Sequence, residues 1–204
     1  MEKIEFLRGK PYKVRRDVKL YDDPMLSFRW WFDFASKTEP NPTAMAYTNI
    51  EDEHPRSRMV LLKYVDYKGF YFFSHRRKID DQDFGRCCLL FHWDTVDLQV
   101  IINGHVCVAD NDIADQYWKT RNRFARAVSL ISDQSSVLEK PLNFVTDILP
   151  AVPKADKRPD HWIGYLVEPY RMEFWQGSSH RLNVRTLYER IPFIDRWHKG
   201  ILSP

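Results

Sequence analysis

The sequence predicts a mainly β protein of the α+β class, in which an antiparallel β-barrel is packed with helices. Many short apolar segments separated by turn residues recur from residue 44 onward, and the helical patterns are grouped before and between them. The chain has 204 residues, of which 44% are hydrophobic and 15% aromatic. This is enough for one domain with a sizeable core. We therefore expect a single domain over residues 23–204.

The N-terminal part predicts an arm followed by a helix. Residues 1–22 are charged and weakly patterned, and we interpret them as an N-terminal arm or lid. Asp23 then stands where a helix N-cap is favoured, and Pro24 suits the first helical position. The helix is expected over residues 24–37 and ends before the Pro/Asn-rich sequence TEPNPT.

The rest of the chain alternates between strand and helix patterns. A helical section is expected from about residue 111 to 149, and the polar sequence PKADKRPD connects it to the last strands. The expected strands are short and rich in residues that favour β-structure. They cover residues 44–50, 56–65, 69–74, 87–93, 97–109, 162–169, 171–177, 184–190 and 193–201.

Composition excludes several classes of function. The net charge is only +3, from 31 basic and 28 acidic residues, without a block of like charges, so no nucleic-acid or membrane surface is predicted. No segment has the length and apolarity of a membrane span or signal sequence. Three cysteines, with Cys87 and Cys88 adjacent, fit neither a disulfide framework nor a metal site. A reduced, cytoplasmic protein is the plain expectation, with no metal.

Phosphate recognition, if present, must rely on side chains. There are seven glycines and neither of the glycine-rich phosphate loops, GxGxxG or GxxxxGK[ST]. In RSRMVLLK, the period of two places Arg58, Val60 and Leu62 on one face and Met59, Leu61 and Lys63 on the other. The two cations at its ends are candidates for anion binding, and solvated ends of a core strand are the alternative.

Other polar residues in apolar surroundings are candidates with equally ordinary alternatives. The sequence SHRRK, from Ser74 to Lys78, is either a phosphate cradle at a strand end or a solvated turn. Gln99 lies within an apolar strand and needs partners if buried. Tyr117 and Arg121 share a helix face, as an anion site or as a surface pair. Gln134 and Ser135 are either site residues or the start of a helix.

The segment EFWQGSSHRLNVR concentrates Trp175, Arg181 and Arg185 in what reads as a hairpin. Asn183 lies between the two arginines.

Taken in order, DPMLSFRWWFDFA, SRMVLLK, LQVIING, SDQSSV and MEFWQG followed by RLNVR resemble the pyridoxamine/pyridoxine 5′-phosphate oxidase family over nearly the whole chain. The resemblance implies a split antiparallel β-barrel, a homodimer with FMN at its interface, and an enzyme of vitamin B6 metabolism. Its substrate would be a small phosphorylated pyridine, pyridoxamine or pyridoxine 5′-phosphate. FMN would accept a hydride from C4′ of the substrate, and O2 would reoxidise the flavin and yield H2O2 and pyridoxal 5′-phosphate.

The resemblance also implies roles for individual residues. The residues implied to contact FMN, some across the dimer interface, are Arg58, Met59, Val60, Leu61, Leu62, Lys63, Phe73, Ser74, Arg77, Lys78, Gln99, Gln134, Ser135, Trp175 and Arg185. Those implied to bind substrate are Lys63, Tyr117, Arg121, Arg181 and Asn183, the last two at the catalytic centre.

The departures from the family pattern concentrate on the substrate side. Asn183 replaces a histidine, and Ala125 replaces a serine implied to contact the substrate phosphate. The loop between Ser74 and Arg77 is shorter than usual, and Ile163 replaces a glycine. These changes leave two alternatives to the leading hypothesis: a related flavin oxidase for another heterocycle, or a weakly catalytic paralogue that binds FMN or pyridoxal phosphate.

Overall fold

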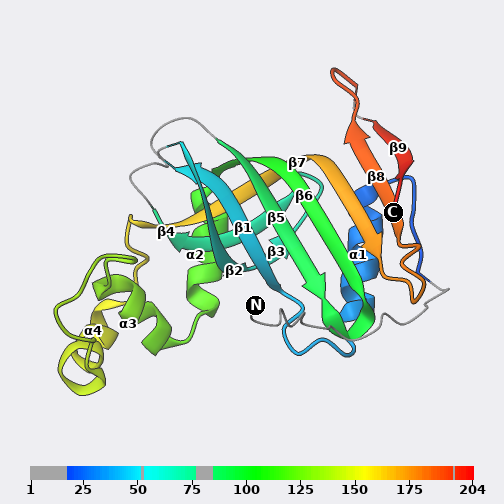
Figure 1. The fold of residues 1–204 in the computed structure, drawn as a ribbon. Helices are drawn as coiled ribbons and strands as arrows, with labels where there is room; N and C mark the ends of the chain where they lie inside the picture. The colour runs from blue at the N-terminus through cyan, green and yellow to red at the C-terminus, as the bar shows by residue number, and fades with distance from the viewer. Residues whose placement is uncertain (1–17, 52, 77–84, 195) are drawn as a thin grey trace. The chain divides into compact units, whose positions relative to one another are not determined.

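The computed structural model describes residues 18–51, 53–76, 85–194 and 196–204. They form two compact units, each built from separate parts of the chain. One unit, called the terminal unit here, comprises Met1–Met45, Cys88–Asn103 and Tyr170–Pro204, and the other, the central unit, comprises Ala46–Cys87 and Gly104–Pro169. The described residues are mainly β with grouped helices, which confirms the predicted α+β class (Figure 1).

The strands follow the predicted order closely. They are β1 (Ala44–Glu51), β2 (His54–Leu61), β3 (Tyr64–Val65), β4 (Phe70–His75), β5 (Arg86–Trp93), β6 (Leu98–Val108), β7 (Trp162–Gln176), β8 (Val184–Arg190) and β9 (Trp197–Leu202). The helical elements are α1 (Pro24–Ala35), η2 (Asp94–Val96), α2 (Asn111–Thr120), α3 (Arg123–Ile131), η3 (Phe144–Ile148), α4 (Leu149–Ala151) and η4 (Val152–Lys154). No helix among the described residues has both the length and the apolarity needed to cross a membrane.

The terminal unit packs helix α1 on a sheet. The side chain of Asp23 accepts a hydrogen bond from the backbone N of Met25 at 2.7 Å, which confirms the predicted N-cap. The aromatic face of α1 is buried against the sheet: Phe28 lies 5.1 Å from Phe91, and Trp31 lies 5.1 Å from Phe174 between ring centroids. In this unit β7 pairs with β8, and β8 pairs with β9, both antiparallel.

The central unit has its core between β4 and the first half of β7. These strands are antiparallel, with Phe70 opposite Val167 and His75 opposite Trp162. Phe72 stacks on Tyr165 with centroids 4.9 Å apart, and Tyr47 packs against Phe72 at 5.0 Å. Burial of these large rings is the main stabilising contribution in this unit.

Arg158 fixes the helical region to the start of β7. Its Nε donates to Asp115 of α2 at 2.6 Å, its Nη2 to Asn111 at 2.9 Å, and its Nη1 to the carbonyl of Trp162 at 2.6 Å. Helix α3 begins where the side chain of Asn122 accepts from the N of Phe124 at 2.8 Å. These contacts hold α2 and α3 beside the strands that carry the candidate site.

Four predictions about element boundaries were wrong. The strand expected over residues 56–65 ends at Leu61, and residues 64–65 form the separate strand β3. A break was expected after residue 169, yet β7 continues through Pro169. Residues 162–167 pair with β4 and residues 171–176 pair with β8, so the proline, which has no N–H, falls between the two partners. The strand expected from residue 193 begins at Trp197, because a turn with Phe193 at φ 66° precedes it. The predicted helical section is interrupted between α3 and η3.

Candidate functional site

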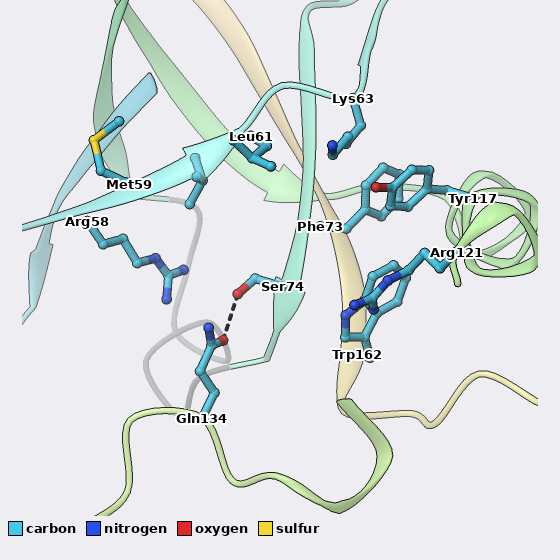
Figure 2. Close-up of a pocket in the computed structure, with 11 residues that line it drawn as sticks. Arg58, Met59, Leu61, Lys63, Phe73, Ser74, Tyr117, Arg121, Gln134 and Trp162 are labelled. Atoms are coloured by element: carbon cyan, nitrogen blue, oxygen red, sulfur yellow. Dashed lines mark hydrogen bonds between the residues drawn. The ribbon is translucent and has the colours of Figure 1, made fainter. Parts of the chain in front are cut away.

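A cavity of about 280 Å³ in the central unit collects residues from four separate parts of the chain (Figure 2). Strand β2 and Lys63 contribute one wall, β4 with Gln134 the floor, and α2 with Arg121 and the start of β7 the opposite wall. The lining residues are Arg58, Met59, Val60, Leu61, Lys63, Phe73, Ser74, Tyr117, Arg121, Gln134 and Trp162.

The cavity brings together ten of the residues implied by the resemblance, all of those above except Trp162. Leu62 does not line it and is buried in the core. The predicted alternation along this segment holds, because residues 58, 60 and 62 are less exposed than 59, 61 and 63. Arg58 and Lys63 nevertheless reach the same cavity, because β2 ends at Leu61 and Lys63 lies beyond the regular alternation of the strand.

Part of the Arg58 guanidinium is buried at the cavity. Its Nε and Nη1 atoms are buried and have no hydrogen-bond partner among the residues that the structure describes. The guanidinium carbon lies 5.5 Å from the centroid of the Tyr47 ring. A buried N–H left unbonded costs about 1–3 kcal/mol, so this arrangement is suited to a ligand that accepts hydrogen bonds.

Ser74 and Gln134 form a polar pair on the floor of the cavity. The Ser74 hydroxyl donates to Oε1 of Gln134 at 2.8 Å, the bond drawn in Figure 2. Gln134 lies in a segment without regular structure after α3, so its position depends on this bond. The alternative that Gln134 starts a helix is therefore wrong.

An aromatic stack forms the wall around the second cationic group. The rings of Phe73, Tyr117 and Trp162 have nearly parallel planes and lie close to one another, with centroids 4.3 Å apart for Phe73 and Tyr117, 5.5 Å for Phe73 and Trp162, and 6.0 Å for Tyr117 and Trp162. Gly164 permits this packing, because a Cβ there would stand 2.9 Å from Cε1 of Phe73. The stack fixes the Tyr117 ring without using its hydroxyl, which leaves that group for a ligand.

Arg121 is held over this stack by neutral groups. Its guanidinium carbon lies 4.7 Å from the Trp162 centroid and 5.3 Å from that of Trp118. Nη1 donates to Oγ of Ser129 at 3.0 Å and Nη2 to the carbonyl of Ala125 at 3.2 Å. Burial lowers the pKa of Arg121, and the nearby Tyr117 opposes that effect. With Lys63, whose Nζ lies 6.0 Å from the Tyr117 ring, it makes this end of the cavity positive.

Two histidines lie behind Arg121. The rings of His75 and His161 meet edge to face at 5.0 Å, and His161 Nε2 is 3.0 Å from the carbonyl oxygen of Ser129. Burial lowers the pKa of His75, and the nearby His161 and Arg121 lower it further. Its imidazole therefore favours the neutral form.

The remaining predicted residues are distributed as follows. Gln99, Trp175, Arg181, Asn183 and Arg185 belong to the terminal unit and do not line the cavity. Ser135 follows Gln134 with φ 74° and does not line it either. Arg77 and Lys78 fall outside the described residues.

In the terminal unit, Trp175 and Arg185 lie opposite each other on the β7–β8 ladder, which places their side chains on one face. Arg185 is bound to Glu173: its Nε and Nη2 both lie 2.8 Å from Oε1 of that carboxylate, and its Nη1 donates to the carbonyl of Ser203 at 3.0 Å. Only 4% of the Glu173 side chain is exposed.

Arg181 and Asn183 lie in the turn between β7 and β8. Arg181 is exposed and has φ 62°, a conformation uncommon for residues other than glycine. The Oδ1 of Asn183 accepts a hydrogen bond from the backbone N of Ser178 at 3.0 Å. In this chain Asn183 therefore holds the turn that presents Arg181.

Sequence reasoning missed Trp162 and Ser129 as site residues. The only signal for Trp162 was an aromatic residue at the start of a strand that follows a polar connection, which is typical of core residues as well. Ser129 had no signal in the sequence, because its contact with Arg121 spans two helices.

Comparison with known proteins agrees with this geometry. A family model described as the pyridoxine 5′-phosphate oxidase C-terminal dimerisation region matches residues 162–204. A pyridoxine/pyridoxamine 5′-phosphate oxidase of Sphingopyxis alaskensis is 38% identical over 92% of this chain and 90% of its own length. One from Bradyrhizobium diazoefficiens is 34% identical over 92% of both chains.

Solved structures show the same fold. PhzG from Burkholderia lata, crystallised with tetrahydrophenazine-1-carboxylic acid, matches with a TM-score of 0.85 and 25% identity over 96% of this chain and all of that chain. A pyridoxamine 5′-phosphate oxidase-related, FMN-binding protein from Nostoc punctiforme matches with a TM-score of 0.69 and 12% identity over 91% of this chain and all of that one. The motifs and the identity to relatives over about nine tenths of both chains lead to one conclusion: the chain belongs to the pyridoxine/pyridoxamine 5′-phosphate oxidase family.

Proposed function

We propose that this protein is an FMN-dependent oxidase that converts pyridoxamine or pyridoxine 5′-phosphate to pyridoxal 5′-phosphate, with O2 as acceptor and H2O2 as product. The observation that carries the proposal is the cavity with two separate cationic groups, one at Arg58 and one at Lys63 and Arg121 (Figure 2). A flavin phosphate and a substrate phosphate need two such groups, and neither can be held by a glycine loop in this chain.

The residues around Arg58 fit FMN. The buried and unpartnered Nε and Nη1 of Arg58 need an acceptor, which the flavin or its phosphate can supply. Ser74 and Gln134 offer further polar atoms, and residues 59–61 provide an apolar edge for a planar ring. We assign the flavin to this side of the cavity, with Arg77 and Lys78 as expected further contacts.

The residues around Arg121 fit the substrate phosphate. Among the described residues, no carboxylate pairs with Lys63 or Arg121, and two of the five N–H groups of Arg121 are used by neutral acceptors. The remaining N–H groups, with the Lys63 ammonium and the Tyr117 hydroxyl, can bind a phosphate dianion through charge-assisted bonds. Asn183 and Arg181 would contact the pyridine ring.

We propose a homodimer in which the terminal unit of one subunit completes the site of the other. The matched dimerisation region, residues 162–204, contains Trp175, Arg181, Asn183 and Arg185, and none of these lines the cavity of its own chain. Gln99 and Ser135 are expected to complete the flavin contacts in the dimer.

Bound FMN would supply the two-electron chemistry, as hydride acceptor from C4′ of the substrate and as reductant of O2. The protein would supply binding and orientation. Lys63, Tyr117 and Arg121 fix the phosphate, and Arg181, charged at every working pH, orients the ring. No residue is needed as a covalent nucleophile. Cations near the flavin stabilise its reduced, anionic form.

A second candidate is the oxidation of another heterocycle by the same chemistry. The structural likeness to PhzG and the replacement of family residues by Asn183 and Ala125 favour it. Lys63, Tyr117 and Arg121 favour the phosphorylated pyridine, because three donors at one end of the cavity suit a dianion better than a carboxylate.

The test is an oxidase assay on purified, FMN-reconstituted protein. Pyridoxine 5′-phosphate and pyridoxamine 5′-phosphate are supplied separately, with unphosphorylated pyridoxine as the matched control, and aldehyde and peroxide are both measured. We expect aldehyde and peroxide in equal amounts from the phosphorylated vitamers and little turnover of pyridoxine. FMN-loaded protein that leaves both phosphorylated vitamers unchanged, and that shows no anaerobic flavin bleaching with them, would refute the proposal.

A further inference from the structure

We propose that Ser129 is a positioning residue for the substrate phosphate, which acts by holding the guanidinium of Arg121 through a neutral hydrogen bond. The proposal rests on the function proposed above, and it assigns a role to Ser129, a residue to which the family pattern gives none. Ser129 itself does not line the cavity.

The first argument is the geometry of Arg121. The residue follows α2, and its side chain reaches across to α3, where Ser129 Oγ and the carbonyl oxygen of Ala125 accept its Nη1 and Nη2 at 3.0 and 3.2 Å. Residues 125 and 129 lie one helical turn apart on the same face. The Trp118 and Trp162 rings, whose centroids are 4.8 Å apart, both lie on one side of the guanidinium. Together with the two hydrogen bonds they hold its orientation and leave the remaining N–H groups for the cavity.

The second argument is that Ser129 is itself fixed. It is 7% exposed, and its carbonyl oxygen lies 3.0 Å from Nε2 of His161, whose ring packs edge to face on His75. These two histidines stand at the end of β4 and just before β7, the strands that carry Phe73 and Trp162. The hydroxyl that holds Arg121 is therefore fixed to the same strands as the aromatic stack.

The third argument is electrostatic. A hydroxyl satisfies one buried N–H of Arg121 and leaves the positive charge whole, whereas a carboxylate in its place would neutralise that charge. Among the described residues Arg121 has only neutral hydrogen-bond partners. This choice of partner suits a guanidinium that must attract an anion.

Helix α3 supports Arg121 through two different groups, at positions 125 and 129. Ala125 has no hydroxyl, and its contribution to Arg121 is a backbone oxygen. Ser129, one turn further along α3, supplies a hydroxyl to the same guanidinium. In this chain, α3 therefore carries a hydroxyl that supports Arg121, the arginine proposed to bind the phosphate, and none at position 125.

The experiment compares four variants in the FMN-loaded protein: Ser129→Ala, Ser129→Asp, Ala125→Ser/Ser129→Ala, and Ser36→Ala as the control. Ser36 is an exposed helix-end serine whose hydroxyl bonds the Phe32 carbonyl at 2.7 Å. The readouts are kcat and KM for pyridoxine 5′-phosphate, the Kd for pyridoxal 5′-phosphate, competition by inorganic phosphate, and the Kd for FMN.

We expect Ser129→Ala to raise KM and the Kd for pyridoxal 5′-phosphate about tenfold, with kcat within about twofold and FMN binding unchanged. Ser129→Asp keeps an acceptor but neutralises the charge, so we expect a loss of about a hundredfold. The double variant returns a hydroxyl to position 125 and should recover most of the affinity. Ser36→Ala should match the wild type.

The outcomes separate this inference from the proposed function. If wild type turns over pyridoxine 5′-phosphate and Ser129→Ala leaves KM and both anion affinities unchanged, the inference is overturned and the function stands. If wild type shows no turnover but Ser129→Ala still weakens binding of pyridoxal 5′-phosphate and inorganic phosphate, the function fails and the inference stands. Should Ser129→Ala not fold, Ser129→Thr and Ser129→Val replace it, since these differ only in the hydroxyl, and equal affinities would overturn the proposal.

Discussion

Replacing Arg58 by alanine should weaken FMN binding without lowering the stability of the FMN-free protein. The residue lines the cavity with Nε and Nη1 buried and unbonded among the described residues. In the free protein those groups contribute a desolvation cost that no hydrogen bond offsets. In the complex, the same two N–H groups stabilise the bound flavin, because the flavin accepts hydrogen bonds from them. The two effects of the substitution therefore have opposite signs.

The magnitudes follow from the contacts of the side chain. A charge-assisted hydrogen bond lost from the complex costs about 1.5–3 kcal/mol, or about tenfold to a hundredfold in the Kd for FMN. In the free protein, the main favourable contact removed is the one with the Tyr47 ring at 5.5 Å, worth about 0.5–1 kcal/mol. Removal of two unsatisfied N–H groups offsets it, so the free energy of unfolding should stay within about 1 kcal/mol of wild type.

Fluorescence titration with FMN gives the Kd, and urea unfolding of the FMN-free protein gives the stability. Arg56→Ala is the matched control, because Arg56 lies two residues earlier on the same strand, is exposed and does not line the cavity. It should leave the Kd for FMN unchanged. A Kd in Arg58→Ala equal to that of wild type would refute the assignment of the flavin to this side of the cavity. A loss of stability in the free protein as large as the loss of binding would show that Arg58 is structural.

Two further predictions concern buried charges elsewhere in the chain. Arg185→Ala should destabilise the protein by about 1–3 kcal/mol in urea unfolding. Among the described residues, it leaves the buried carboxylate of Glu173 with only the longer ion pair to Arg171 at 3.4 Å. An unchanged unfolding midpoint would show that the ion pair with Arg185 contributes nothing to stability. The lowered pKa of His75, caused by burial, His161 and Arg121 and opposed by Asp133 and the Ser129 carbonyl, predicts full stability above about pH 6.5. Stability should then fall as the pH drops from about 6.5 toward the pKa of His75 in the folded protein, because the unfolded chain binds the proton first. Thermal melts of His75→Gln should show a flatter pH dependence than those of wild type. The control variant His180→Gln, at an exposed position, should follow wild type.

The elements of the fold were predictable where a local signal decides them. Asp23 and Pro24 set the start of α1, and the apolar run after Gly69 sets β4. Pro169 misled the prediction because a proline ends a strand only where its missing N–H is needed. In β7 that position falls between two pairing partners, and no local pattern reveals which partners a strand will have.

Much of the candidate site was predictable through the family pattern. The cavity gathers residues between Arg58 and Gln134 that are distant in the sequence, and composition alone could not have grouped them. The terminal unit adds a feature that the pattern did not contain. Arg185 was expected at the flavin, and in this chain it holds a buried glutamate. A guanidinium has five donors, so it can keep Glu173 and the Ser203 carbonyl and still offer an N–H to a ligand. The flavin contact proposed for Arg185 would therefore couple binding to stability at this residue.

Ser129 could not be predicted, because its contact with Arg121 depends on where α3 starts. The cap at Asn122 together with the extended backbone of Arg121 fixes that point. With α3 starting there, Ser129 presents its hydroxyl and Ala125 its backbone carbonyl to the guanidinium. The sequence shows only that position 125 is an alanine, whereas the three-dimensional arrangement shows that Arg121 receives a side-chain hydroxyl from the next turn of α3.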